Sequence, residues 1–462
     1  MTPSFTRSSA APALSAPPAQ LRAADPLRAI KRGIWAYFLL LIFEGALRKW
    51  ILPALDVPLL IVRDPLALWL IVATWRRGLL AANFYLTSMT LVGIIAFFTA
   101  LLLGHGSLPV AVYGARILLL HFPLIFVIGR VFDRADVERI GRAMVWISIP
   151  MTVLIALQFY SPQSAWVNRG VGGDLEGAGF SGALGFFRPP GTFSFTNGNS
   201  FFYSLLACFV FYFWLTPRSI NRLALARATA GLLAAVPFSI SRTLLFQVLI
   251  TLVFTLFAAS RRPRYLARIV PALVGGVLVL AVLSQTPLLQ TPLEAFSSRI
   301  DSASEFEGGV KGTLGDRYLG GMVGALTGVG SSRVPFFGYG IGMGTNVGSK
   351  LLSGDRGFLL AEEEWPRLIG EMGVVLGLAT IFIRLGLTAK IALACYRQMA
   401  LGEALAWLLL SFGLTTIPQG QWAQPTALGF SALMGGLILA ALRPPKHTLI
   451  APRPADAVPS LR

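Results

Sequence analysis

Two arginines stand where an apolar chain leaves little room for a charge. Arg188 precedes the apolar run that begins near residue 199, and Arg242 follows Ser239-Ile-Ser241 at a junction with almost no loop between two apolar runs. An ionisable residue held at membrane depth is costly and is a functional candidate by default. Guanidinium groups stay charged when partly desolvated and bind phosphate oxygens in a bidentate manner. The pattern favours recognition of a phosphate group; snorkelling to lipid headgroups is the alternative.

The residues between Arg188 and the next apolar run add a second anion-binding feature. Asn197, Gly198 and Asn199 are expected to open a helix, because Asn is a good N-cap. The free N–H groups of a helix N-terminus favour anions. The alternative is a turn with a capping Asn and an interfacial Arg.

The segment 285–367 holds charges and glycines, including Arg299, Arg317 and the run Glu362-Glu363-Glu364. A carboxylate before an apolar run is either a solvated acidic face or a general base, which must reach an acceptor hydroxyl. The glycines of 338–344 lack the spacing of a nucleotide cradle and follow no strand. They instead predict a tight turn that brings the backbone close to a substrate or a helix.

Two further charge pairs are expected to be structural. Glu44 and Arg48 are four residues apart near the end of the first apolar run, and Arg63-Asp64 begins the second. Each is interpreted as an ion pair that satisfies buried charge, rather than as catalytic machinery.

Composition supports a bilayer as the solvent of this chain. Of its 462 residues, 55% are hydrophobic and 13% are charged, against about 25% charged in a soluble domain. The mean hydropathy is +0.68. Two cysteines inside apolar runs and three scattered histidines favour neither a disulfide framework nor a metal site.

The apolar runs predict an all-α polytopic membrane protein with about twelve transmembrane helices and a large periplasmic loop between spans 9 and 10. A disordered cytoplasmic tail, 1–32, precedes spans 1–9 in 33–284, which include a periplasmic loop at 161–198. The large loop covers 285–367, spans 10–12 lie in 368–442, and a cytoplasmic tail covers 443–462. The runs lie near 33–47, 57–75, 86–104, 108–129, 143–160, 199–216, 225–240, 243–259, 268–284, 368–388, 404–418 and 427–442.

The net charge of +18 has a topological explanation. With both termini in the cytoplasm, the excess of Lys and Arg falls in the cytoplasmic segments, which is the positive-inside pattern. A nucleic-acid partner is therefore not expected. Since loops beyond about 15 residues usually carry function or disorder, function is expected at the extracytoplasmic face.

These elements, in this order, resemble the bacterial O-antigen polymerase and O-antigen ligase superfamily of membrane glycosyltransferases. The resemblance covers about residues 35–440. It rests on the following motifs: Ser241-Arg242, Arg317, Gly338–Gly344 and Glu371-Met-Gly373, with Glu44–Trp50 and Arg63-Asp-Pro65 similar to a subgroup associated with exopolysaccharide synthesis.

The resemblance implies transfer of a sugar chain from a polyprenyl-pyrophosphate-linked oligosaccharide on the periplasmic side of the inner membrane, with no metal or other cofactor. It implies that Arg188, Arg242 and Arg317 bind the pyrophosphate, with Arg242 and Arg317 also counted as catalytic, because guanidinium groups stabilise the charge on the leaving group. Membrane lipid and a polysaccharide chain-length regulator are the further partners considered.

One position departs from the family. Ligases of this superfamily commonly carry a His-Asn pair nine residues before the position of Glu371, and here that position is Glu362. The departure favours a polymerase, with Glu362 as the base and Glu364 as the second choice. An O-antigen ligase or protein O-oligosaccharyltransferase is one alternative. A flippase for lipid-linked sugars is another, although no internal repeat typical of transporters is found.

Overall fold

The computed structural model describes residues 26–307, 324, 334–354, 359–361 and 363–444. Most of them are helical, and the one sheet among them is a hairpin of two short strands, β1 (Phe180–Ser181) and β2 (Phe187–Arg188). This architecture agrees with the predicted all-α class. The first helix, α1 (Arg28–Ala46), begins inside the segment that was expected to be a disordered tail.

Seven helical stretches of the described chain are long and apolar enough to cross a membrane, which indicates a membrane-embedded protein. They are Pro53–Arg76, with α2 (Asp56–Leu60) and α3 (Arg63–Arg76); α4 (Phe84–Leu102); Leu108–Val131, with α5 (Leu108–Arg116) and α6 (Phe122–Val131); α7 (Arg134–Tyr160); α8 (Thr196–Leu215); α10 (Arg242–Ser260); and α15 (Glu364–Ala400).

The other helices fall into two groups. Two are shorter and apolar, namely α16 (Leu405–Thr416) and α17 (Pro425–Ala441). The rest of the α-helices are α1, α9 (Arg222–Ser239), α11 (Pro263–Ser284), α12 (Pro287–Glu307) and α14 (Asn346–Ser353). Every predicted apolar run coincides with a helix, but not all of these helices meet the criteria for a span, so the count of about twelve stays a prediction. The helices α12 and α14 lie within the segment predicted to be a large loop.

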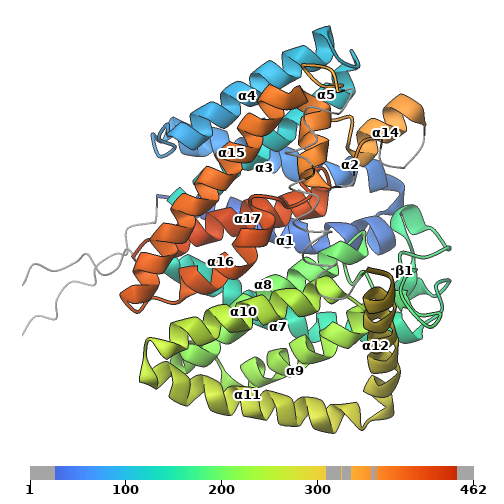
Figure 1. Cartoon of the computed structure of the whole chain (residues 1–462), viewed down its shortest axis with the longest axis vertical. Coiled ribbons are helices and arrows are strands. Elements are labelled where there is room, and N and C mark those ends of the chain that lie inside the picture. Colours follow the sequence, from blue (N-terminus) through green and yellow to red (C-terminus); the bar gives the residue numbers. More distant parts are fainter. Residues whose placement is uncertain (1–25, 308–323, 325–333, 355–358, 362, 445–462) are drawn as a thin grey trace, which may run out of the picture.

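Successive helices run back and forth between two ends of the bundle (Figure 1). At one end, Lys31 near the start of α1 pairs with Asp136 near the start of α7 (2.8 Å), and Arg268 of α11 donates to the carbonyl of Leu215 at the end of α8 (2.6 Å). We name this the basic end. The opposite end, which holds residues 161–195, α12 and α14, we name the loop end.

The helix α8 forms the centre of the bundle. In the most apolar stretch of α8, 89% of the residues are buried. The corresponding share is 22% for Pro53–Arg76 and 28% for α4. In a bilayer the exposed apolar side chains of the outer helices contact acyl chains, so the perimeter of the bundle is as apolar as its centre. Because α8 is central and 20 residues long, its two ends lie about 30 Å apart, one at the loop end and one at the basic end.

The glycine-rich segment 338–344 folds against the start of α15. The backbone N–H groups of Tyr339 and Gly340 donate to the carbonyls of Gly370 and Glu371, both at 2.9 Å. These bonds hold the segment as a tight turn on a helix, so the expectation of a turn that brings the backbone close to a helix is confirmed.

The other side of this turn contacts α5 just as closely. Gly342 has φ of +94°, and a Cβ placed there would collide with the carbonyl oxygen of Val110 and the backbone of Gly114. Two backbones therefore touch at a point where only glycine fits on conformational and steric grounds.

A pair of glycine substitutions tests this contact. Gly354 also has a positive φ (+77°), but open space surrounds its Cβ position. Both Gly342→Ala and Gly354→Ala carry left-handed strain of about 1–2 kcal/mol. Only Gly342→Ala must also push α5 away, which adds about 1–3 kcal/mol. We expect Gly342→Ala to lower the thermal unfolding midpoint of the purified protein clearly more than Gly354→Ala; equal shifts would contradict the close contact.

Candidate functional site

The β1–β2 hairpin carries Arg188 and rests on the junction between α9 and α10. Phe186, just before β2, stacks on Phe159 of α7 with ring centroids 4.7 Å apart. The backbone of Gly182 lies against the side chains of Ile240 and Arg188. Aromatic stacking and this close approach fix the hairpin over the junction, so Arg188 is held by tertiary contacts rather than by its short strand.

The α9–α10 junction is a single turn. Ile240 adopts a left-handed conformation (φ +45°), and the Ser241 hydroxyl caps α10 by accepting a hydrogen bond from the N–H of Leu244 (3.3 Å). The same hydroxyl is 3.0 Å from that of Ser200 in α8. Arg242 is therefore the first residue of α10, at the loop end. A left-handed β-branched residue is unusual and marks a position that its surroundings over-determine.

The helix α12 brings a third arginine to this place. It packs against α9, and the Tyr160 hydroxyl at the end of α7 donates to the carbonyl of Leu288 (2.7 Å). Arg299 of α12 thereby lies close enough to Arg188 to perturb its ionisation.

The electrostatics of Arg188 define the site. Burial lowers the pKa of its guanidinium to about 10, and the positive charges of Arg299 and Arg242 act in the same direction. Its Nε is buried and has no hydrogen-bond partner among the described residues. We name Arg188, Arg242 and Arg299 the arginine site. A buried donor beside two more cations is suited to an anion with several charges.

The segment directly after β2 is tied to two helices. The Lys49 ammonium, 1% exposed, donates to the carbonyl of Gly191 (2.7 Å). The amide of Gln158 brackets the same residue, accepting from its N–H (2.8 Å) and donating to its carbonyl (3.2 Å). The hydroxyl of Thr192 donates to the carbonyl of Ile42 (2.6 Å). These bonds fix where the hairpin leaves the site.

The prediction that an asparagine caps the N-terminus of α8 is wrong. The helix begins at Thr196, and its N-cap is Phe195, which offers no side-chain acceptor. The Asn197 amide donates to Oε1 of Gln424 (3.2 Å). The Asn199 amide donates to the carbonyl of Pro189 (3.3 Å) and so holds the residue that follows Arg188. The Asn199 bond ties α8 to the segment after β2, and the Asn197 bond ties it to the residue before α17.

The two expected structural charge pairs have different outcomes. Glu44 pairs with Arg48 (3.4 Å), as predicted, and also with Arg63 (3.0 Å). Arg63 therefore does not pair with the adjacent Asp64, which binds Arg116 of α5 (2.7 Å). Adjacent residues on a helix point about 100° apart, so each side chain finds its partner on another element.

Glu364, the second choice for a general base, lies in a buried ion cluster. One of its oxygens accepts from Arg367 (2.9 Å) and Arg384 (2.6 Å), and the other accepts from the N–H of Trp422 (3.0 Å). The residue is 4% exposed, and Arg367 also pairs with Glu371 (2.6 Å). A general base must reach an acceptor hydroxyl, and this carboxylate is fully engaged in holding α15 to the α16–α17 connection.

The structure brings together two of the predicted pyrophosphate ligands, Arg188 and Arg242. Arg317 and Glu362 lie outside the described residues, so their roles stay predictions. Sequence reasoning named Arg299 only as one charge of a long loop. The available signal was the apolar spacing of Leu289, Leu293 and Phe296, which is typical of a helix packed on one face.

The ion cluster around Glu364 makes a stability prediction. Arg384, 1% exposed, also donates to the carbonyl of Ile417 (2.8 Å). Arg384→Met should lower stability by about 3–5 kcal/mol, because the buried carboxylate of Glu364 loses one of its two arginine partners. Thermal unfolding of the purified protein measures this, with Arg397→Met, an exposed arginine of the same helix, as the control. Similar midpoints for the two variants would show that the cluster does not hold the fold.

No protein-family model matches this chain, and no curated protein matches it either.

Proposed function

We propose that this protein is a membrane glycosyltransferase that polymerises polyprenyl-pyrophosphate-linked oligosaccharide units, and that the arginine site binds the pyrophosphate of the donor. The observation that supports this best is the guanidinium of Arg188. It is partly buried, its Nε has no partner among the described residues, and both charged groups that perturb it are arginines.

A pyrophosphate matches what this site offers. Three cations held together repel one another, so the ligand that offsets their repulsion must itself carry more than one negative charge. Guanidinium groups bind phosphate oxygens through two parallel hydrogen bonds, and a pyrophosphate presents oxygens on two phosphorus atoms. A pyrophosphate can therefore contact more than one of these guanidinium groups at once.

The surroundings of the site suit a donor with a lipid tail. The arginine site lies at the ends of α8 and α10, where apolar helices of membrane-spanning length begin. Phe180, Phe187 and Phe195 on the adjoining segment are each more than two-fifths exposed. Aromatic side chains are common where a protein meets the membrane interface, so a polyprenyl tail can lie in the bilayer while its pyrophosphate contacts the arginines.

The reaction that we propose balances without a metal. The oxygen of an acceptor sugar hydroxyl bonds to the anomeric carbon of the donor, whose bond to the pyrophosphate oxygen breaks. The electron pair of that bond leaves with the pyrophosphate, and guanidinium groups placed in advance stabilise the growing charge. A carboxylate takes the hydroxyl proton, and Glu362 remains our candidate by its position in the sequence. Arg317 is a fourth candidate for the pyrophosphate.

The membrane orientation in this proposal follows the positive-inside rule. Basic end residues such as Lys31, Arg142, Arg222 and Arg268 would face the cytoplasm of a bacterial cell. The loop end, with the arginine site, would then face the periplasm, where lipid-linked repeat units meet a growing chain.

Substitutions in the arginine site test the proposed role. Arg188→Ala, Arg242→Ala and Arg299→Ala should each reduce sugar transfer by roughly 100-fold or more, because each removes a donor aimed at the developing charge. Lysine at these positions should also impair transfer, since a point charge cannot make the bidentate contact. Polymer formation in cells producing equal amounts of each variant is the measurement, and Arg397→Ala, exposed at the basic end, is the control. Full polymer from the Arg188→Ala and Arg242→Ala cells would remove the arginine site from the reaction.

Deletion of the gene distinguishes the reaction classes. We expect single lipid-linked repeat units to accumulate on the periplasmic face, with no polymer. Long lipid-linked polymer that never reaches its acceptor would instead indicate a ligase. Repeat units trapped on the cytoplasmic face would indicate a flippase. The length and membrane face of the accumulated saccharides are the quantities to measure.

A further inference from the structure

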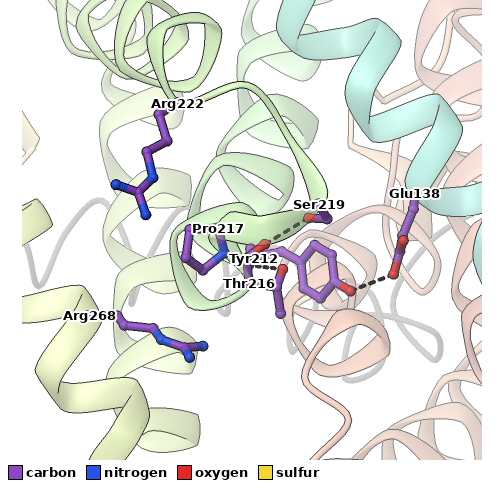
Figure 2. Close-up of a pocket in the computed structure, with 7 residues that line it drawn as sticks. All are labelled: Glu138, Tyr212, Thr216, Pro217, Ser219, Arg222 and Arg268. Atoms are coloured by element: carbon purple, nitrogen blue, oxygen red, sulfur yellow. Dashed lines mark hydrogen bonds between the residues drawn. The ribbon is translucent and has the colours of Figure 1, made fainter.

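A second cationic site lies at the basic end, about 30 Å from the arginine site along α8. It is an open cavity of about 700 Å³ between the end of α8, the short turn Pro217–Ser219, the start of α9 and the first turns of α11. Figure 2 shows the side chains that line it, among them Arg222 and Arg268, which extend into the same space from different helices.

The charge of this cavity is positive. Its one acidic lining residue, Glu138, accepts a hydrogen bond from the Tyr212 hydroxyl (2.6 Å) and lies 3.5 Å from Arg134. The charge of Glu138 is therefore balanced by Arg134 and not by Arg222 or Arg268. Arg268 uses one nitrogen on the carbonyl of Leu215, and Arg222 has no side-chain partner among the described residues.

The turn beneath these arginines is held by its own bonds. The Thr216 hydroxyl donates to the carbonyl of Tyr212 (2.9 Å), and the Ser219 hydroxyl donates to the carbonyl of Thr216 (2.7 Å). Arg142 of α7 donates to the carbonyl of Ser219 (3.3 Å). The hydroxyl hydrogens are thus committed to the turn, and the two guanidinium groups are the donors that remain for an anion.

An apolar surface runs along α11, the helix that carries Arg268. The side chains of Val270, Val274, Val277, Leu278 and Val282 are between 50% and 68% exposed. Val277 and Leu278, three and four residues after Val274, share one side of the helix with it. A ligand that fits both features carries a negative head for the arginines and hydrocarbon for this face.

We propose that this cavity binds the phosphate headgroup of an anionic membrane phospholipid through Arg222 and Arg268, with the acyl chains lying along α11. A soluble phosphate would use the arginines but not the exposed apolar face. The polyprenyl donor does not fit, because in our proposal its pyrophosphate binds at the opposite end of α8. Only this exclusion of the donor rests on the proposed function; binding of the phospholipid does not.

The test measures binding of phosphatidylglycerol to the full-length purified protein in phosphatidylcholine nanodiscs, by native mass spectrometry. Each arginine near an anionic lipid contributes about fivefold in affinity, so Arg222→Gln with Arg268→Gln should weaken binding by about thirtyfold. The matched control is Arg227→Gln with Arg264→Gln, which removes the same charge from the same two helices outside the cavity.

Each outcome decides the proposal. Arg268 also donates a hydrogen bond to the end of α8, so its loss could disturb the fold. Arg222→Gln alone is therefore measured as well, and a decrease of about fivefold in the affinity of this variant for phosphatidylglycerol supports the site. Equal losses in the cavity variant and the matched control would mean a diffuse basic belt and would overturn it. Displacement of the lipid by inorganic phosphate would mean a soluble anion site and would overturn it too.

Discussion

The loop end is organised around the repulsion among three guanidinium groups. Arg188, Arg242 and Arg299 come from a hairpin, a helix start and a separate helix, so no local sequence holds them together. Burial and like charge both disfavour this arrangement, as the lowered pKa of Arg188 shows. The fold maintains it through contacts elsewhere, such as the Lys49 and Gln158 bonds to Gly191. Strain of this kind, offset by surrounding structure, is typical of a site prepared for a ligand.

The carboxylates near the loop end show why these arginines are distinctive. Glu44 pairs with Arg48 and Arg63, and Asp64 pairs with Arg116. Glu364 pairs with Arg367 and Arg384. Glu371 pairs with Arg367 and accepts from the N–H of Gly344. These pairs join α1 to α3, α3 to α5, and α15 to its neighbours. Buried charges are retained in a low-dielectric interior only when paired in this way. The acidic groups thus serve the scaffold, and the cations of the arginine site lie beside one another.

Some of this arrangement follows from the sequence, and some does not. Arg242 was placed correctly because two apolar runs meet there with almost no residues between them, which confines it to a helix end. Arg299 was not identified, because α12 is polar enough to read as part of a loop, and its position depends on packing against α9. Glu364 was chosen by its distance from Glu371, but its role is decided by Arg384, twenty residues away and one helical segment further along. Spacing along a chain does not report such partners.

Positive charge collects at both ends of the bundle, yet the two ends differ chemically. At the loop end the arginines are partly buried, and Arg299 and Arg242 lower the pKa of Arg188, so a ligand gains from desolvated, directional bonds. At the basic end Arg222 and Arg268 are exposed and border an apolar helix face, where attraction is weaker and shared with hydrocarbon contacts. Net charge alone does not distinguish the two ends. The burial of each cation and the groups beside it separate the proposed pyrophosphate site from the proposed lipid site.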